Sequence, residues 1–152
     1  MDVTTFGAGC FWKPEFLLGK INGVLKTRVG YMGGSTKNPT YEQVCTGQTG
    51  HAEVVQINYD PKLLNYESLL DYFWEMHDPT QLDRQGLDVG SQYRSIIFCH
   101  SKDQEEKAST SLLKIQESGN YLRKIVTVIT TDQTFWPAED YHQKYYEKNH
   151  RY

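Results

Sequence analysis

The chain has 152 residues, of which 23% are charged, and its net charge is −3. This length predicts one domain over residues 1–152 with a single core. The charges are not segregated by sign, which disfavours a nucleic-acid patch and a polybasic membrane anchor. No apolar run approaches a membrane span and no signal-peptide pattern opens the chain. We therefore expect a cytoplasmic monomer, provided that no targeting segment has been removed.

Apolar, β-branched runs alternate with amphipathic runs, which indicates alternating strands and helices. In chain order the predicted elements are a strand at 3–6, a helix from Cys10 through Leu18, strands at 24–29 and 53–59, a helix capped by Asn65, a strand at 94–99, a helix after the capping-box pattern at 101–104, a strand at 125–130 and a helix at 138–146 with Pro137 in its first turn. Two long loops, 30–50 and 77–91, are typical of functional segments. The alternation predicts an α+β two-layer sandwich.

The segment from Gly7 to Trp12 places a cysteine directly before a predicted helix and beside two large aromatic residues. Free N–H groups and the positive end of a helix dipole favour the thiolate form of Cys10, which is the nucleophilic form. The alternative is a buried structural cysteine with two core aromatic rings. Cys10 is thus a candidate nucleophile, and Phe11 and Trp12 are a candidate apolar wall.

The three cysteines, Cys10, Cys45 and Cys99, are an odd number and contain no C-x-x-C pair. That disfavours a disulfide framework and a structural zinc site, and it suits reduced thiols. No His or carboxylate cluster has metal-ligand spacing either, so we expect no metal.

Strand parity singles out Glu53, because it shares a face with the apolar residues Val55, Ile57 and Tyr59. A carboxyl group on an apolar face is desolvated and its pKa is raised, so it can remain protonated and act as a general acid. The alternative is an edge glutamate whose carboxylate reaches solvent.

Several polar residues lie in or beside the two loops. The phenols of Tyr41 and Tyr93 could donate hydrogen bonds in a pocket or simply pack, and Asp88 could cap its loop. Arg94 could be a surface charge or the partner of a buried carboxylate. No local pattern places a histidine beside Cys10, as a cysteine hydrolase would require.

Seven short motifs follow one another along nearly the whole chain: GCFW at 9–12, GYMGG at 30–34, NPTY at 38–41, TGHAEV at 49–54, HDPT at 77–80, DVGSQYRS at 88–95 and PAEDYHQ at 137–143. Together they resemble the peptide methionine sulfoxide reductases of the A type. The resemblance implies a mixed β-sheet with a ferredoxin-like core. It also implies reduction of the S epimer of methionine sulfoxide, free or in oxidised proteins and peptides, and no organic cofactor, because thiols supply the electrons.

The resemblance also implies residue roles. Cys10 attacks the sulfoxide sulfur and becomes a sulfenic acid, and Glu53 protonates the sulfoxide oxygen. In the implied pocket the phenols of Tyr41 and Tyr93 hydrogen-bond that oxygen. The rings of Phe11 and Trp12 cage the methyl group, and Asp88 supports substrate binding.

The end of the chain departs from the family pattern, because many relatives carry recycling cysteines in a tail that contains none here after Tyr141. We therefore expect a one-cysteine cycle in which thioredoxin, or glutaredoxin with glutathione, reduces the sulfenic acid. The alternative is an internal disulfide from Cys10 to Cys45 or Cys99. Two other classes remain open: a cysteine-dependent acyl or thiol transferase, and a non-catalytic binder of methionine-rich or oxidised segments.

Overall fold

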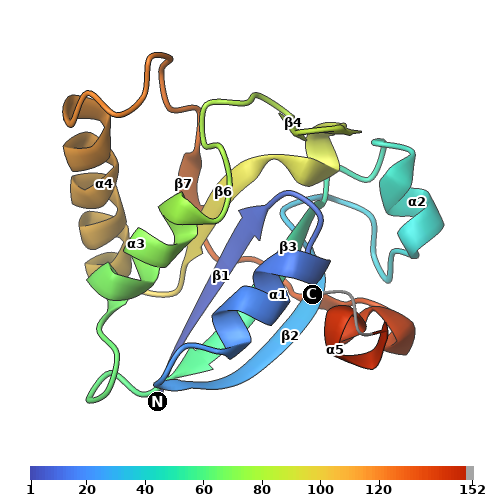
Figure 1. Cartoon of the computed structure of the whole chain (residues 1–152). Helices are drawn as coiled ribbons and strands as arrows, with labels where there is room; N and C mark the ends of the chain where they lie inside the picture. Colours follow the sequence, from blue (N-terminus) through green and yellow to red (C-terminus); the bar gives the residue numbers. More distant parts are fainter. Residues whose placement is uncertain (150–152) are drawn as a thin grey trace.

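The computed structural model describes residues 1–149, and its centre is a six-stranded sheet with the order β7-β6-β1-β3-β2-β8 (Figure 1). These strands are β1 (Asp2–Ala8), β2 (Val24–Met32), β3 (Ala52–Tyr59), β6 (Ser95–Cys99), β7 (Val128–Thr131) and β8 (Trp136–Pro137). Neighbouring strands are antiparallel except for β6 and β7, which are parallel. The expected α+β class and mixed sheet are confirmed.

The α-helices are α1 (Trp12–Gly19), α2 (Tyr41–Cys45), α3 (Tyr66–Glu75), α4 (Lys102–Glu117) and α5 (Tyr145–Asn149). Two short strands, β4 (Arg84–Gln85) and β5 (Asp88–Val89), form a separate hairpin, and 3₁₀ turns cover η1 (Ser91–Tyr93) and η2 (Asp140–His142). Within residues 1–149 no helix is both long and apolar enough to cross a bilayer.

The main core lies between one face of the sheet and helices α1, α3 and α4 (Figure 1). Alternate residues of β3, among them Val55 and Ile57, join Leu18 of α1 and Phe73 of α3 in this core. Each large apolar side chain buried there contributes about 1.5–3 kcal/mol relative to exposure. A smaller cluster, against which Phe135 packs, is formed by Met32, Ala52, Val54, Ile96 and Phe98.

Two predicted helix starts are confirmed by their caps. The side chain of Asn65 accepts a hydrogen bond from the Ser68 N–H at 2.8 Å, and that of Ser101 accepts one from the Gln104 N–H at 3.1 Å. The Gln104 side chain does not complete a capping box. It accepts instead from the His100 N–H at 2.9 Å.

The predicted helix at 138–146 is wrong. Pro137 ends β8 opposite Gly30, residues 140–142 form only a 3₁₀ turn, and the α-helix is confined to residues 145–149. The cause is a long-range pairing with β2. The Gln143 side chain accepts from the Val29 N–H and donates to the Val29 carbonyl, both at 2.9 Å, and the Ala138 N–H reaches the same carbonyl at 3.0 Å. These bonds hold the segment against the sheet edge, where a helix could not form them.

The two long loops contain short ordered elements. In the first loop Thr40 caps α2 through a full capping box with Gln43, and in the second the β4–β5 hairpin projects beyond the sheet (Figure 1). Both elements carry residues of the site described next.

Candidate active site

Cys10 lies on the turn between β1 and α1, directly after Gly9, whose φ of 86° favours glycine. The thiol is half-buried and free. Its pKa is raised to about 12, chiefly by burial and then by the nearby Glu53, while a hydrogen bond from the Trp12 backbone N–H lowers it. The expectation of a resting thiolate is therefore wrong, because burial outweighs the effect of the N–H group at the helix start.

Glu53 lies at the start of β3 and is 1% exposed. Its Oε1 accepts a hydrogen bond from the Phe11 N–H at 3.3 Å, while Oε2 has no partner among residues 1–149. Burial raises the pKa of Glu53 to about 8 against the opposing effect of that N–H, and Asp88 raises it further. The parity prediction is confirmed: the carboxyl is buried and protonated at neutral pH, and it is not a solvent-facing edge group.

Three short elements bring side chains close to the Glu53 carboxyl, namely η1 with Tyr93, β5 with Asp88 and α2 with Tyr41. Burial raises the pKa of Tyr93 to about 12, and the charges of Glu53, Cys45 and Asp88 raise it further, so Tyr93 interacts with each of these three groups. The pKa of the Tyr41 phenol is raised chiefly by burial and by its hydrogen bond with the Cys45 thiol. The charges of Glu53 and Tyr93 raise it further. The second loop and α2 thus supply the polar side of the site.

The aromatic wall is held from behind by the C-terminal segment. The Trp12 Nε1–H donates to His142 Nδ1 at 2.9 Å, and the Tyr145 ring packs edge-on against the indole at 3.8 Å. Phe11 is buried, with its ring 5.8 Å from Tyr31 and 5.1 Å from His142.

The sequence prediction did not assign roles to two residues of the PAEDYHQ motif. His142 is fully buried, and because Nδ1 accepts from Trp12, Nε2 carries the ring proton, with no partner among the described residues. Glu139 accepts from the Tyr31 hydroxyl and from the Tyr41 N–H, both at 2.9 Å. In the sequence, only their place in this motif pointed to a role for His142 and Glu139, because the residues that they contact lie about a hundred residues away.

Two candidates lie elsewhere. Arg94 donates to the carbonyls of Ser91 and Gly50, both at 2.9 Å, so it fastens η1 to the turn before β3 rather than pairing with a carboxylate. Cys99 is buried and interacts with Tyr66. Because Ser95 pairs with Ala8, the four residues from Ser95 to Cys99 place Cys99 about 13 Å farther along β6.

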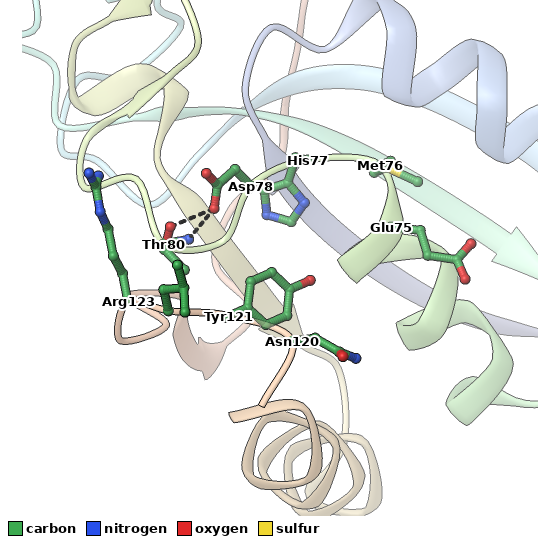
Figure 2. Close-up of a pocket in the computed structure, with 9 residues that line it drawn as sticks. Glu75, Met76, His77, Asp78, Thr80, Asn120, Tyr121 and Arg123 are labelled. Atoms are coloured by element: carbon green, nitrogen blue, oxygen red, sulfur yellow. Dashed lines mark hydrogen bonds between the residues drawn. The ribbon is translucent and has the colours of Figure 1, made fainter. Parts of the chain in front are cut away.

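A hollow of about 490 Å³, drawn in Figure 2, is lined by none of these residues. At its edge the His77 ring donates to the Phe73 carbonyl at 2.8 Å and accepts from the Ser95 hydroxyl at 2.7 Å, which ties α3 to β6. Burial lowers the pKa of His77 to about 4, so the ring is neutral. Within residues 1–149 no three His, Cys, Asp or Glu side chains are grouped to hold a metal ion.

Comparison with known proteins decides the family. Residues 2–152 match the family model described as peptide methionine sulfoxide reductase. The chain belongs to the peptide methionine sulfoxide reductase family. It is 58% identical over 150 residues to the peptide methionine sulfoxide reductase MsrA of Methanothermobacter thermautotrophicus, covering 99% of this chain and 89% of that protein.

Solved structures agree with this assignment. The reductase is similar to reduced Mxr1 from Saccharomyces cerevisiae, with a TM-score of 0.92 at 37% identity over 99% of this chain and 87% of that one. Mxr1 in complex with Trx2 matches with a TM-score of 0.66 at 27% identity over 95% and 84% of the two chains. The resemblance seen in the motifs is confirmed, and the protein is an oxidoreductase that reduces methionine sulfoxide.

Proposed function

We propose that this reductase acts on the S epimer of methionine sulfoxide, free or in oxidised proteins and peptides, with Cys10 as nucleophile and Glu53 as general acid. The observation that carries the proposal is the state of Glu53. One carboxyl oxygen is held by the Phe11 N–H, and the other is buried, unpartnered within residues 1–149 and protonated at neutral pH. Such a group can deliver a proton where a sulfoxide oxygen would lie.

The chemical step balances without a cofactor. The Cys10 sulfur attacks the sulfoxide sulfur while Glu53 gives its proton to the sulfoxide oxygen, which weakens the S–O bond. The thiol proton replaces the one that Glu53 has given. The net products are methionine and a Cys10 sulfenic acid, so the substrate sulfur gains two electrons and the cysteine sulfur loses two.

The raised pKa of Cys10 fits this order of events. At rest the thiol keeps its proton because burial disfavours the thiolate. A sulfoxide whose oxygen receives a proton carries positive charge on sulfur, and that charge stabilises a neighbouring thiolate. The substrate itself therefore lowers the pKa of Cys10, and the thiol is reactive only when a sulfoxide is bound.

The walls of the site account for selection between epimers. The methyl group lies against Phe11 and Trp12, where each sulfur–aromatic contact contributes about 0.3–1.5 kcal/mol. The oxygen faces Glu53 and the two phenols of Tyr41 and Tyr93, and Asp88 supports the same side. The site fixes the directions of the methyl group and the oxygen around the sulfoxide sulfur, and Cys10 fixes the direction of attack. The remaining substituent, which leads to the peptide chain, then points out of the pocket in only one of the two epimers.

For the recycling step we propose direct reduction of the sulfenic acid by an external thiol, with thioredoxin or glutaredoxin and glutathione as donors. The Mxr1–Trx2 complex supports thioredoxin. Cys99 is buried away from the site, but Cys45 is exposed at the end of α2 and is close enough to Cys10 to influence its pKa. An internal disulfide to Cys45 is the rival route, and the two routes differ in oxidation product.

Mass spectrometry separates these routes. After one equivalent of sulfoxide without reductant, direct reduction predicts a protein heavier by one oxygen at Cys10. A protein lighter by two hydrogens, with Cys10 bridged to Cys45, would overturn it.

The same enzyme tests the reaction itself. With dithiothreitol as reductant, wild type should consume only the S enantiomer of methyl p-tolyl sulfoxide, and Cys10→Ser should consume neither. A variant lacking the Cys10 sulfur that still turned over would exclude the mechanism. A transferase is disfavoured because His51, His77, His100 and His142 make their hydrogen bonds with groups other than Cys10.

We also infer that the core follows the ferredoxin-like pattern. The order of elements β1-α1-β2-β3-α3-β6 and the strand order β6-β1-β3-β2 support this reading. Strands β7 and β8 would then be additions at the two edges.

A further inference from the structure

Gln85 lies where three parts of the site meet. It belongs to β4, and in the hairpin it pairs with Asp88 of β5. Its half-buried side chain leaves the hairpin toward the turn that carries Cys10. No role has been assigned above to this residue.

The amide end of Gln85 is held by one residue, Asp78. Its Oε1 accepts from the Asp78 N–H at 2.8 Å, and its Nε2–H donates to the Asp78 carbonyl at 2.9 Å. The amide thus satisfies both backbone groups of Asp78, as a neighbouring strand would. Asp78 is itself held in place, since its carboxylate accepts from the Thr80 N–H and hydroxyl at 3.0 and 2.6 Å (Figure 2).

The stem of the same side chain packs under Gly9. A Cβ built on Gly9 would lie 2.9 Å from the Gln85 Cβ and 3.0 Å from its Cγ, so the two residues are in direct contact. Gly9 has a φ of 86° and immediately precedes Cys10. The backbone that carries the thiol therefore rests on a side chain whose far end is anchored at two points.

We propose that Gln85 is a positioning residue that supports the Gly9–Cys10 turn and holds it in register with Asp88. The inference rests on the proposed role of Cys10. Attack on a sulfoxide requires the sulfur within about 3–3.5 Å of its target, and a misplacement near 1 Å can cost 10²-fold in rate. Loss of the two amide hydrogen bonds frees the stem and removes this support. The Trp12 ring of the aromatic wall is held separately, by His142, so substrate binding is spared.

Gln85→Met tests the proposal, because methionine keeps a stem of similar length and removes both hydrogen bonds. Gln81→Met is the matched control: Gln81 lies beside the same hairpin and accepts from the Gly86 N–H at 2.7 Å, but it is not among the nearest neighbours of a Gly9 Cβ. With methyl p-tolyl sulfoxide, we expect Gln85→Met to lower kcat for sulfenic acid formation at least tenfold and change KM less than twofold. Gln81→Met should stay within twofold of wild type in both.

The pH dependence of Gln85→Glu distinguishes a positioning role of this side chain from a merely structural one. A protonated carboxyl can accept from the Asp78 N–H and donate to its carbonyl, as the amide does, whereas an ionised one cannot donate. The rate of Gln85→Glu relative to wild type should therefore be higher at pH 5 than at pH 8, while the ratio for Gln85→Met should not change with pH. This variant also serves if Gln85→Met fails to fold.

Three results would overturn the inference: normal kcat in Gln85→Met, an equal loss in Gln81→Met, or a pH-independent ratio for Gln85→Glu. The Cys10→Ser variant shows whether the proposed role of Gln85 or the proposed function itself is wrong. If Cys10→Ser remained active, the role of Cys10 itself would be wrong. If it is inactive and Gln85→Met behaves as wild type, only the role of Gln85 is wrong.

Discussion

At the scale of single residues, the site holds two groups that both keep their protons at neutral pH. Glu53 has a pKa of about 8 and Cys10 a pKa of about 12, and burial is the largest cause of each shift. In the proposed mechanism Glu53 is ready to donate its proton, while the protonated thiol is protected from stray oxidants, which react with thiolates. In that mechanism a bound sulfoxide takes up the Glu53 proton and lowers the pKa of Cys10 at the same time.

Glu53→Gln should change how stability depends on pH. The rise of the Glu53 pKa from 4.5 to about 8 corresponds to roughly 5 kcal/mol, because each unit is about 1.4 kcal/mol. Below pH 4.5 the carboxyl is protonated in the folded and unfolded chain alike. As pH rises toward 8, only the unfolded chain ionises, so wild type loses stability, whereas the variant lacks this loss. Urea unfolding at pH 4.5 and pH 8 should show Glu53→Gln gaining on wild type at the higher pH, and parallel behaviour would refute the assigned shift.

His142→Phe should weaken substrate binding. Phenylalanine keeps the ring packing but removes the acceptor for the Trp12 Nε1–H, and an unpaired buried donor costs about 1–3 kcal/mol. We expect KM for the sulfoxide to rise about five- to tenfold with kcat changed less than threefold, measured by steady-state kinetics. Tyr141→Phe is the control, since it removes only a hydroxyl from a ring that is 55% exposed. An unchanged KM in His142→Phe would show that the indole needs no such anchor.

At the scale of elements, the segment from β8 to α5 connects the sheet edge to the aromatic wall. Its Gln143 side chain bonds both backbone groups of Val29, and the Lys144 N–H donates to the buried Glu15 at 2.7 Å. These bonds fasten the two residues that directly follow His142. The position of the Trp12 indole, the proposed substrate-binding ring of α1, therefore depends on a segment about 130 residues away in the chain.

Gln143→Ala should detach this segment. The Val29 N–H would lose its acceptor, at a cost of about 1–3 kcal/mol, and His142 would lose its position behind Trp12. We expect a lower Tm together with a higher KM, from thermal unfolding and steady-state kinetics. Gln48→Ala is the control, since Gln48 is exposed and its side chain makes no hydrogen bond to β2 in the described part of the chain, and it should change neither. A lower Tm with normal KM would separate the segment from recognition.

Local signals explain which elements could be predicted. The caps at Asn65 and Ser101 bond to N–H groups three residues away, so a short pattern contains all the information. The position of Glu53 followed from strand parity for the same reason. The prediction of a helix at 138–146 failed because this segment instead forms hydrogen bonds with Val29, about 110 residues away. No local pattern in the sequence indicates that pairing.

At the scale of the whole molecule, the end of β1 and the start of β3 lie side by side at one end of the sheet, and the β4–β5 hairpin and α2 approach them there, so Cys10, Glu53, Asp88 and Tyr41 come close together. The family motifs indicated this set of residues before the structure did. They did not indicate the resting thiol or the supporting contacts of His142 and Gln85, because these depend on burial and on packing between distant segments.

A double variant, Cys45→Ser with Cys99→Ser, should retain turnover within threefold of wild type with thioredoxin as donor. In a one-cysteine cycle the sulfenic acid at Cys10 is reduced directly, so the other two thiols are dispensable. Each single variant is the control for effects on folding. Turnover lost only when Cys45 is replaced would indicate an internal disulfide.

The most direct test of the central claim is the single-turnover rate of sulfenic acid formation in Glu53→Gln at pH 7, with methyl p-tolyl sulfoxide at saturation. Glutamine keeps the shape and the acceptor for the Phe11 N–H but has no acidic proton. Because a positioned general acid contributes about 10²–10⁴-fold, we predict a loss of at least 10²-fold with native structure retained. A rate equal to that of wild type would contradict the assignment of Glu53 as the proton donor.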